Sequence, residues 1–382
     1  MRRLHKLLFL FIALLFSIPT AAQEVTPDVF QAATYLNRIN LRAGPGETHD
    51  IIAQLGRGDS VTILERSASG VWLHVQHAYS GLDGWVVGGY LTLNPALRFS
   101  DLPVNTEVAD AQTVNLFDPA LQTLYSYPVL PTLSPAMTDL FAQGQANGLR
   151  ADVATKVGDS LVANEYYLTL LGAGTPQLGA HDDLAETVAF FGEALSQPST
   201  AARVGLASYT VMDPMWADKN ICQPNETALA CEYRLRQPAV ALIMFGANDV
   251  QFIDAEQYGK WLKAIIEESL AVGVIPVLFT FSYDPESPLW ANALAFNLKL
   301  GELATEYEIP LVNLWAAARI LPQYGLDEDK IHLKNSGFDV LDLTNGNEAF
   351  FGVTLQNLLA LRVLDTIRRT IIEPTLELNE GT

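Results

Sequence analysis

Three polar segments of this sequence contain the residue types that an acyl-transfer site needs. They are Gly158-Asp159-Ser160-Leu161, Gly246-Ala247-Asn248-Asp249 and Asp329-Lys330-Ile331-His332. A serine hydroxyl becomes a nucleophile when a histidine removes its proton, and a carboxylate orients that histidine. The tetrahedral intermediate then needs hydrogen-bond donors aimed at its oxyanion. The segments supply a candidate for each role, so they predict acyl transfer through a covalent serine intermediate.

Few histidines are available to act as the base for Ser160. The chain has 6 histidines, and those that follow residue 80 are His181 and His332. His332 lies three residues after Asp329, so this carboxylate can accept from one ring nitrogen while the other nitrogen faces Ser160. His181 precedes two aspartates, a pattern typical of a solvated helix start. We therefore expect Ser160 to be the nucleophile, His332 the base and Asp329 the orienting carboxylate.

Two oxyanion donors are expected from the same segments, the backbone N–H of Ser160 and the side-chain amide of Asn248. The alternative for Asn248 is a turn residue, because amides directly after buried strands commonly have that role. Gly158 allows a sharp turn before the serine. A helix beginning after Ser160 would aim its unpaired N–H groups and its positive dipole end at the site.

Five apolar stretches are predicted to be the strands that bring these segments together. They are residues 153–157, 203–206, 239–245, 273–281 and 309–314. Other stretches carry apolar side chains at helical spacing, as in residues 258–270 and 355–371. Continuous apolar strands alternating with helices indicate a parallel sheet covered on both faces. We predict an α/β fold, a flavodoxin-like three-layer sandwich with a five-stranded parallel sheet, whose strand-end loops converge.

The first hundred residues have a different pattern. Residues 1–22 join a basic head, about 12 apolar residues and several small residues, which is typical of a secretory signal peptide. The apolar run is shorter than the ~20 residues of a spanning helix, and a retained N-terminal anchor is the alternative. Residues 30–94 alternate short strands with Gly-rich turns and predict a small all-β barrel. The chain is therefore expected to be secreted or extracytoplasmic.

The rest of the chain, residues 95–382, divides into three parts. Residues 95–149 are proline-rich and predict a wrapping linker with a lead-in helix at 134–146. Residues 150–372 form the α/β domain, and residues 373–382 form an acidic tail that is expected to fray.

Cysteine content and charge restrict the remaining options. Cys222 and Cys231 enclose a short loop and are expected to form a disulfide, with two free thiols as the alternative. Their spacing does not support a metal site. The formal charge of −20 repels phosphate backbones and anionic membranes, so nucleic-acid partners and stable membrane insertion are not expected. The sequence does not predict an oligomeric state.

The predicted barrel is similar to the bacterial Src-homology-3-like domains of exported proteins. The similarity lies in residues 40–46, Trp72 and residues 81–86. It implies a cell-wall or other extracellular ligand for this domain. Trp72 and Trp85 either line a groove for that ligand or belong to the core of the barrel.

The three polar segments resemble the nucleophile, Gly-x-Asn-Asp and Asp-x-x-His blocks of the SGNH/GDSL hydrolase family, over residues 150–370. The resemblance implies hydrolysis of carboxylic esters without a cofactor, with Ser160, His332 and Asp329 as the triad and Asn248 as an oxyanion donor.

One block departs from the family pattern. The family places a glycine after its second strand, and the backbone N–H of that glycine completes the oxyanion hole. Ser208 occupies this place here, and Gly205 is the alternative match.

The function expected from these features is that of a secreted serine esterase. Its substrate would be a small-molecule or polysaccharide ester, such as an acetylated carbohydrate outside the cell. One alternative is a non-catalytic carbohydrate- or cell-wall-binding protein on a degenerate hydrolase fold. The other is a lipase, thioesterase or peptidase that uses the same triad.

Overall fold

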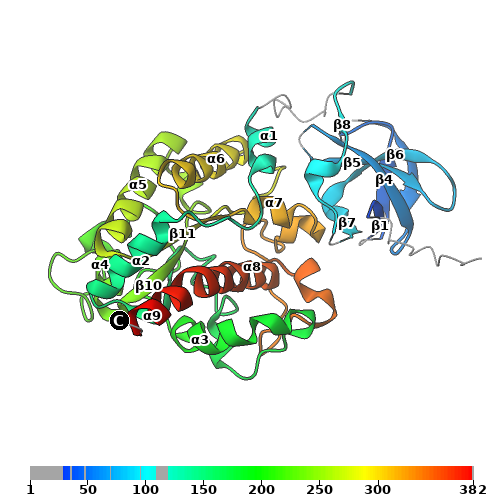
Figure 1. Cartoon of the computed structure of the whole chain (residues 1–382). Coiled ribbons are helices and arrows are strands. Elements are labelled where there is room, and N and C mark those ends of the chain that lie inside the picture. Colours follow the sequence, from blue (N-terminus) through cyan, green and yellow to red (C-terminus); the bar gives the residue numbers. More distant parts are fainter. Residues whose placement is uncertain are drawn as a thin grey trace, which may run out of the picture.

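The computed structural model describes residues 29–34, 37–46, 49–68, 70–94, 96–108 and 119–380, and the predicted signal peptide lies outside these ranges. An antiparallel β domain, blue in Figure 1, lies beside a larger α/β domain. Within these ranges, every helix is too short or too polar to cross a bilayer. One buried apolar cluster runs from the β domain into the α/β domain, so the two domains share a continuous core.

The β domain occupies the region predicted to be an all-β barrel. Its strand order is β3-β2-β6-β5-β4-β1-β7, with antiparallel neighbours, and β8 pairs with β4 in parallel. Trp72 and Trp85 are buried together with Val71 and belong to the core, and Trp72 also lines a cavity of this domain. The strands are β1 (Gln31–Thr34), β2 (Ile39–Arg42), β3 (Ile51–Leu55), β4 (Ser60–Ser67), β5 (Trp72–His77), β6 (Asp83–Val87), β7 (Leu91–Leu93) and β8 (Val104–Asn105).

The segment predicted to be a wrapping linker is attached to both domains. It contributes β8 to the first sheet, and its α1 (Pro119–Ser126) packs on α6 (Trp290–Glu306). The side chain of Asn313 donates to the carbonyl oxygen of Leu124 at 2.8 Å, which holds the segment against the α/β domain. The predicted lead-in helix is α2 (Ala136–Ala146).

The parallel sheet has the order β12-β11-β10-β9. Its strands are β9 (Arg150–Gly158), β10 (Pro238–Met244), β11 (Ile275–Phe279) and β12 (Leu311–Val312). The α/β class with a parallel sheet is confirmed, but the predicted strand at 203–206 is wrong. Only an isolated parallel bridge between Gly158 and Ala202 occupies its place, because the chain turns at once and Gly205 has a φ of +81°. The sheet therefore has four strands and one bridge where five strands were predicted.

Helices cover both faces of this sheet (Figure 1). α5 follows the Asn248 loop, begins with a capping box between Asp254 and Gln257, and ends at Gly273 with a φ of +90°. α5 packs beside α6, and α3 packs beside α8. The remaining bounds are α3 (Ala185–Ser196), α4 (Ala228–Arg236), α5 (Ala255–Val272), α7 (Leu314–Ala318) and α8 (Gly352–Ile367).

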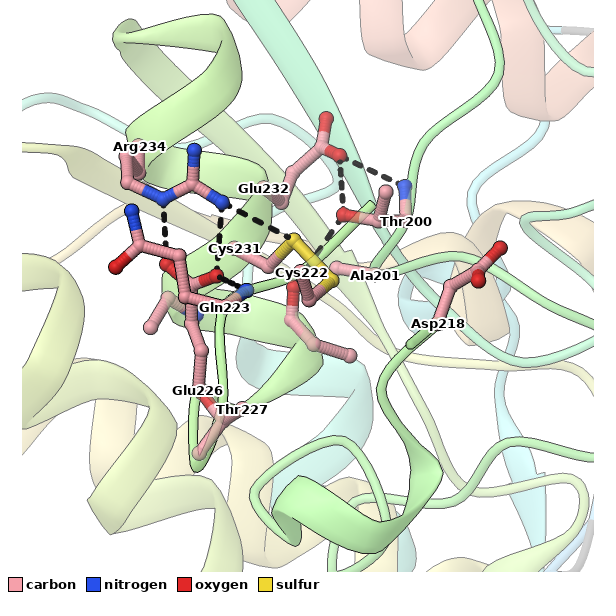
Figure 2. The surroundings of a disulfide bond; sticks show 12 residues. Thr200, Ala201, Asp218, Cys222, Gln223, Glu226, Thr227, Cys231, Glu232 and Arg234 are labelled. Carbon is pink, nitrogen blue, oxygen red and sulfur yellow. Dashed lines mark hydrogen bonds and ion pairs between the residues drawn. A yellow bond between two sulfur atoms is a disulfide. The ribbon is translucent and has the colours of Figure 1, made fainter. Parts of the chain in front are cut away.

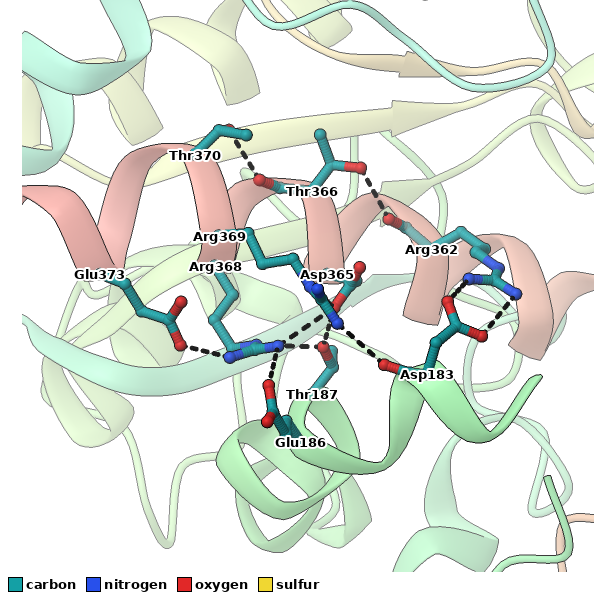
Figure 3. Close-up of polar contacts among 10 residues, drawn as sticks. All are labelled: Asp183, Glu186, Thr187, Arg362, Asp365, Thr366, Arg368, Arg369, Thr370 and Glu373. Atoms are coloured by element: carbon teal, nitrogen blue, oxygen red, sulfur yellow. Dashed lines mark hydrogen bonds and ion pairs between the residues drawn. The ribbon is translucent and has the colours of Figure 1, made fainter.

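The predicted acidic tail begins as a helix and does not fray from residue 373. A π-helical turn (Arg368–Ile372) joins α8 to α9 (Glu373–Glu380). The buried guanidinium of Arg368 forms ion pairs with Asp365, Glu186 and Glu373 (Figure 3). Because Glu373 belongs to this network, the start of the tail is fixed to the domain.

Cys222 and Cys231 form the predicted disulfide (Figure 2). The next residue of α4, the buried Glu232, accepts hydrogen bonds from the N–H and the hydroxyl of Thr200 at 2.7 and 2.8 Å. Ala201 follows Thr200, and its carbonyl oxygen accepts a hydrogen bond from the N–H of Gly158 at 3.0 Å. The disulfide region therefore supports the end of β9, and the candidate nucleophile Ser160 comes directly after this strand.

Candidate active site

Ser160 lies just beyond β9, at the edge where the parallel strands end. Gly158 is the last residue of β9, and a Cβ there would lie 2.3 Å from the carbonyl oxygen of Met244 on β10. A larger residue at 158 would push the two strands apart. Glycine is therefore required by close approach of the backbone.

The helix predicted directly after Ser160 is not formed. The carbonyl oxygen of Asp159 accepts from the N–H groups of Val162 and Ala163, which closes a single turn. The side chain of Asn164 then accepts from the N–H of Tyr166 at 2.8 Å, and such local bonds compete with helical ones. The site consequently lacks the helix dipole that the sequence predicted.

Ser160, His332 and Asp329 form one line of hydrogen bonds. His332 Nε2 lies 2.9 Å from Ser160 Oγ, and His332 Nδ1 lies 2.6 Å from Asp329 Oδ2. The other oxygen of Asp329 accepts from the N–H groups of Ile331 and His332 at 3.0 and 2.9 Å. These bonds fix the carboxylate, which in turn orients the imidazole toward the serine hydroxyl.

Asp329 is stabilised in its charged form. Partial burial raises its pKa, but the hydrogen bonds from the His332 ring and from the N–H groups of Ile331 and His332 outweigh burial and leave the pKa below its ordinary value. The side chains of Asp329 and His332 are 50% and 41% exposed. A bulky ester can therefore approach this pair from solvent.

The loop that carries this pair is anchored by Lys330. Its ammonium group lies 3.2 Å from Asp284 and 3.0 Å from Glu286, on the segment that follows β11. At the base of the loop, the N–H of Asp327 donates to the carbonyl oxygen of His332 at 2.8 Å. These contacts hold the loop in the position that places His332 beside Ser160. The spacing of the Asp-x-x-His block gave no signal for this role of the lysine.

Asn248 and Ser208 approach the site differently from what the sequence predicted. One side-chain N–H of Asn248 donates to the carbonyl oxygen of Leu206 at 3.0 Å, which leaves its second N–H for an oxyanion. The backbone N–H and the hydroxyl of Ser208 both bond to Asp249 Oδ1, at 3.0 and 2.5 Å. The N–H of Ser208 is thus engaged by a carboxylate, and Gly205 lies on an exposed turn. The contacts therefore leave one amide N–H of Asn248 for a further partner and engage the N–H of residue 208 with a carboxylate.

Two buried carboxylates lie behind these loops. The N–H of Leu161 donates to Asp159 at 2.9 Å, while Asp249 holds Ser208. The pKa of Asp159 is raised to about 7, mainly by burial and also by the nearby charge of Asp249, against the lowering effect of the N–H groups of Leu161 and Asn248. Burial also raises the pKa of Asp249. Each acid has one oxygen without a hydrogen-bond partner in the described ranges. The sequence pattern assigned Asp159 no role of its own.

The other candidates lie elsewhere. His181 Nδ1 lies 2.8 Å from a guanidinium nitrogen of Arg362, and its Nε2 lies 3.4 Å from Glu348, so it belongs to a polar cluster at α8. Cys222 and Cys231 lie near Glu226, but the two sulfurs are bonded to each other and offer no thiolate to a metal.

Each domain matches a family model in the comparisons with known proteins. Residues 37–92 match the family of bacterial SH3 domains, and residues 157–340 match the GDSL-like Lipase/Acylhydrolase family. The search of curated proteins gave no match.

Three similar solved structures illustrate the range of relatives. A GDSL-like lipase from Bacteroides thetaiotaomicron is 13% identical, with 60% of this chain and 98% of that chain covered and a TM-score of 0.36. Axe2, an acetylxylan esterase from Geobacillus stearothermophilus, is 16% identical, with coverages of 56% and 93% and a TM-score of 0.36. A member of the lipolytic G-D-S-L family from Veillonella parvula is 17% identical, with coverages of 55% and 97% and a TM-score of 0.32. Similarity at this level transfers no property to the chain.

Proposed function

We propose that Ser160 is the nucleophile of this chain. The premise is that the chain is an ester hydrolase whose larger domain belongs to the GDSL-like lipase/acylhydrolase family. In this proposal His332 is the general base and Asp329 orients it. The observation that carries the proposal is the line of hydrogen bonds from Asp329 through His332 to Ser160, at 2.6 and 2.9 Å. Donor and acceptor atoms at these distances are ready for proton transfer.

The reaction follows from these contacts. As Ser160 Oγ attacks the ester carbonyl carbon, His332 Nε2 takes the hydroxyl proton, and Asp329 stabilises the imidazolium. The backbone N–H of Ser160 and the second amide N–H of Asn248 donate to the oxyanion. When the C–O bond of the ester breaks, His332 returns the proton to the leaving alcohol and an acyl-serine results. A water molecule, deprotonated by His332, then releases the acid and restores Ser160.

We infer that the substrate is an extracellular acyl ester on a carbohydrate. The half-exposed His332 and Asp329 support a substrate larger than a free small ester. The formal charge of −20 opposes docking on anionic membranes, which disfavours a lipase role at such surfaces. The signal peptide predicted for residues 1–22 and the disulfide support an oxidising, extracytoplasmic location. An acyl-chain-length series separates this proposal from a lipase or thioesterase role, because the proposal expects the highest rate with acetyl esters.

Kinetics with p-nitrophenyl acetate test the nucleophile. Ser160→Ala is expected to lose at least about a thousandfold in kcat, because the covalent step is removed. Ser100→Ala, at an exposed serine of the β domain, is the matched control and is expected to keep the wild-type rate. Equal rates for Ser160→Ala and the wild type would refute the proposal. Absence of Ser160-dependent turnover in the wild type would favour the non-catalytic binding protein.

A further inference from the structure

Two cavities meet at the boundary between the β domain and the catalytic loop. One, of about 280 Å³, lies on the β domain, and Asn37, Arg38 and Asn40 line its polar part. The other, of about 270 Å³, lies between the two domains and reaches the loop of residues 327–330. Val87 and Tyr90 line both cavities, so the two are neighbouring parts of one surface. We name this surface, from Asn37 to Lys330, the barrel–loop groove.

The walls of the barrel–loop groove are fixed relative to each other. The hydroxyl of Tyr324 donates to the carbonyl oxygen of Val71 across the domain boundary, at 3.2 Å. A Cβ on Gly89 would lie 3.1 Å from the backbone of Gln323, which shows how closely the two domains approach. Gln323 and Tyr324 have φ values of +52° and +59°, which is strained for side-chain-bearing residues. Such strain is kept where the surrounding structure imposes it, frequently at binding sites.

The lining of the groove selects among ligands by charge. Its catalytic end contains four carboxylates on two segments, those of Asp284, Glu286, Asp327 and Glu328. Lys330 pairs with the first two, so this end of the groove keeps a negative excess, while Arg38 and Arg42 carry positive charge at the far end. Ionised carboxylates accept hydrogen bonds and do not donate. This end therefore repels anionic polymers and suits a chain of hydroxyl donors.

The middle and the far end of the groove fit the same kind of chain. The half-buried ring of Tyr90 presents an apolar surface at the junction of the two cavities. The amides of Asn37 and Asn40 both donate and accept, and the exposed Arg38 donates. Hydroxyl donors, hydroxyl acceptors and apolar C–H faces occur together in a neutral glycan.

We propose that the barrel–loop groove binds a neutral glycan chain that carries the scissile ester, so that the β domain forms part of the substrate site. This inference rests on the function proposed for Ser160. Asp329 lies between Glu328 and Lys330 of the groove lining, so a chain in the groove passes beside the turn that carries Asp329 and His332. The β domain would then contact the glycan beyond the scissile ester, and it would also attach the protein to a surface.

Isothermal titration calorimetry with unacetylated sugars tests the groove independently of catalysis. The probes are cellohexaose, xylohexaose and chitohexaose as neutral chains, and hexagalacturonate as the anionic match. The full-length chain is expected to bind at least one neutral hexasaccharide and to bind hexagalacturonate more weakly. Tyr90→Ala and, separately, Arg38→Ala are expected to weaken that binding about tenfold. Tyr79→Ala is the control, because this tyrosine is 95% exposed on the same domain and outside the groove, and it is expected to bind as the wild type does.

The outcomes distinguish the two proposals. No binding of any neutral hexasaccharide, tighter binding of hexagalacturonate, or unchanged binding by both groove variants would overturn the groove. Turnover of p-nitrophenyl acetate that survives in Ser160→Ala would overturn the proposed function and leave the binding result standing. If both proposals hold, Tyr90→Ala lowers kcat/KM for acetylated cellohexaose or its xylan or chitin counterpart and keeps the wild-type rate on p-nitrophenyl acetate.

Discussion

The buried carboxylate next to the nucleophile makes stability depend on pH in a defined direction. Asp159 is fully buried, and burial raises its pKa from an ordinary value of 3.8 to about 7. In the unfolded chain this group loses its proton near pH 4, whereas in the folded chain it keeps the proton up to about pH 7. Between these values the folded state binds more protons, so the free energy of unfolding falls as pH rises. The difference between the two pKa values corresponds to a decrease of about 4 kcal/mol in the free energy of unfolding from pH 4 to pH 7.

Asp159→Asn removes this titration. The asparagine keeps an oxygen that accepts from the N–H of Leu161, which donates to Asp159 at 2.9 Å. Between pH 5 and pH 8 the free energy of unfolding of the wild type is expected to fall by about 3 kcal/mol more than that of the variant, by the same linkage. Groups away from Asp159 and its neighbour Asp249 titrate equally in both proteins, so the difference between the two pH profiles reports the titration of this pair.

Urea unfolding at pH 5 and pH 8 measures this difference. The matched control is Asp152→Asn on the same strand, because the side chain of Asp152 is 52% exposed and its replacement is expected to leave the pH profile of the wild type unchanged. Parallel pH profiles for the wild type and Asp159→Asn would refute the reasoning. They would mean that Asp159 is already ionised at pH 5 in the folded chain.

Three further predictions concern the loops around the site. Lys330→Met removes both ion pairs that anchor the His332 loop and is expected to lower kcat for p-nitrophenyl acetate up to about tenfold with KM little changed; an unchanged kcat would contradict this. Asn248→Ala is expected to lower kcat about a hundredfold through loss of an oxyanion donor, and a change confined to KM would contradict it. The double variant Cys222→Ser/Cys231→Ser is expected to lose about 3 kcal/mol of unfolding free energy while keeping its activity at low temperature, and an unchanged urea midpoint would contradict it.

The parts of the site that the sequence predicts best are those that directly follow strong strands. Ser160 and Asn248 come after β9 and β10. β10 is continuously apolar, and β9 is buried along its second half, as expected of parallel strands inside the domain. His332 was identifiable because few histidines compete with it. These residues are predictable because strand ends place them at one edge whatever the loop geometry.

The errors have local physical causes. The stretch at 203–206 is apolar enough for a strand, but Gly205 turns the chain. Asn164 diverts the turn after Ser160 from a helical path. Side-chain pairings over long sequence distances, such as Lys330 with Glu286 or Ser208 with Asp249, have no signature in a single sequence. The groove between the domains was equally invisible, because it depends on how the two domains pack.

Covalent labelling tests the central claim most directly. The full-length chain is treated with a fluorophosphonate, its intact mass is measured, and the modified peptide is mapped. We predict a single adduct on the peptide that contains Ser160, no adduct on Ser160→Ala, and much slower labelling of His332→Ala, because His332 Nε2 lies 2.9 Å from the hydroxyl it would deprotonate. An unlabelled wild type, or an adduct on a different serine, would contradict the account.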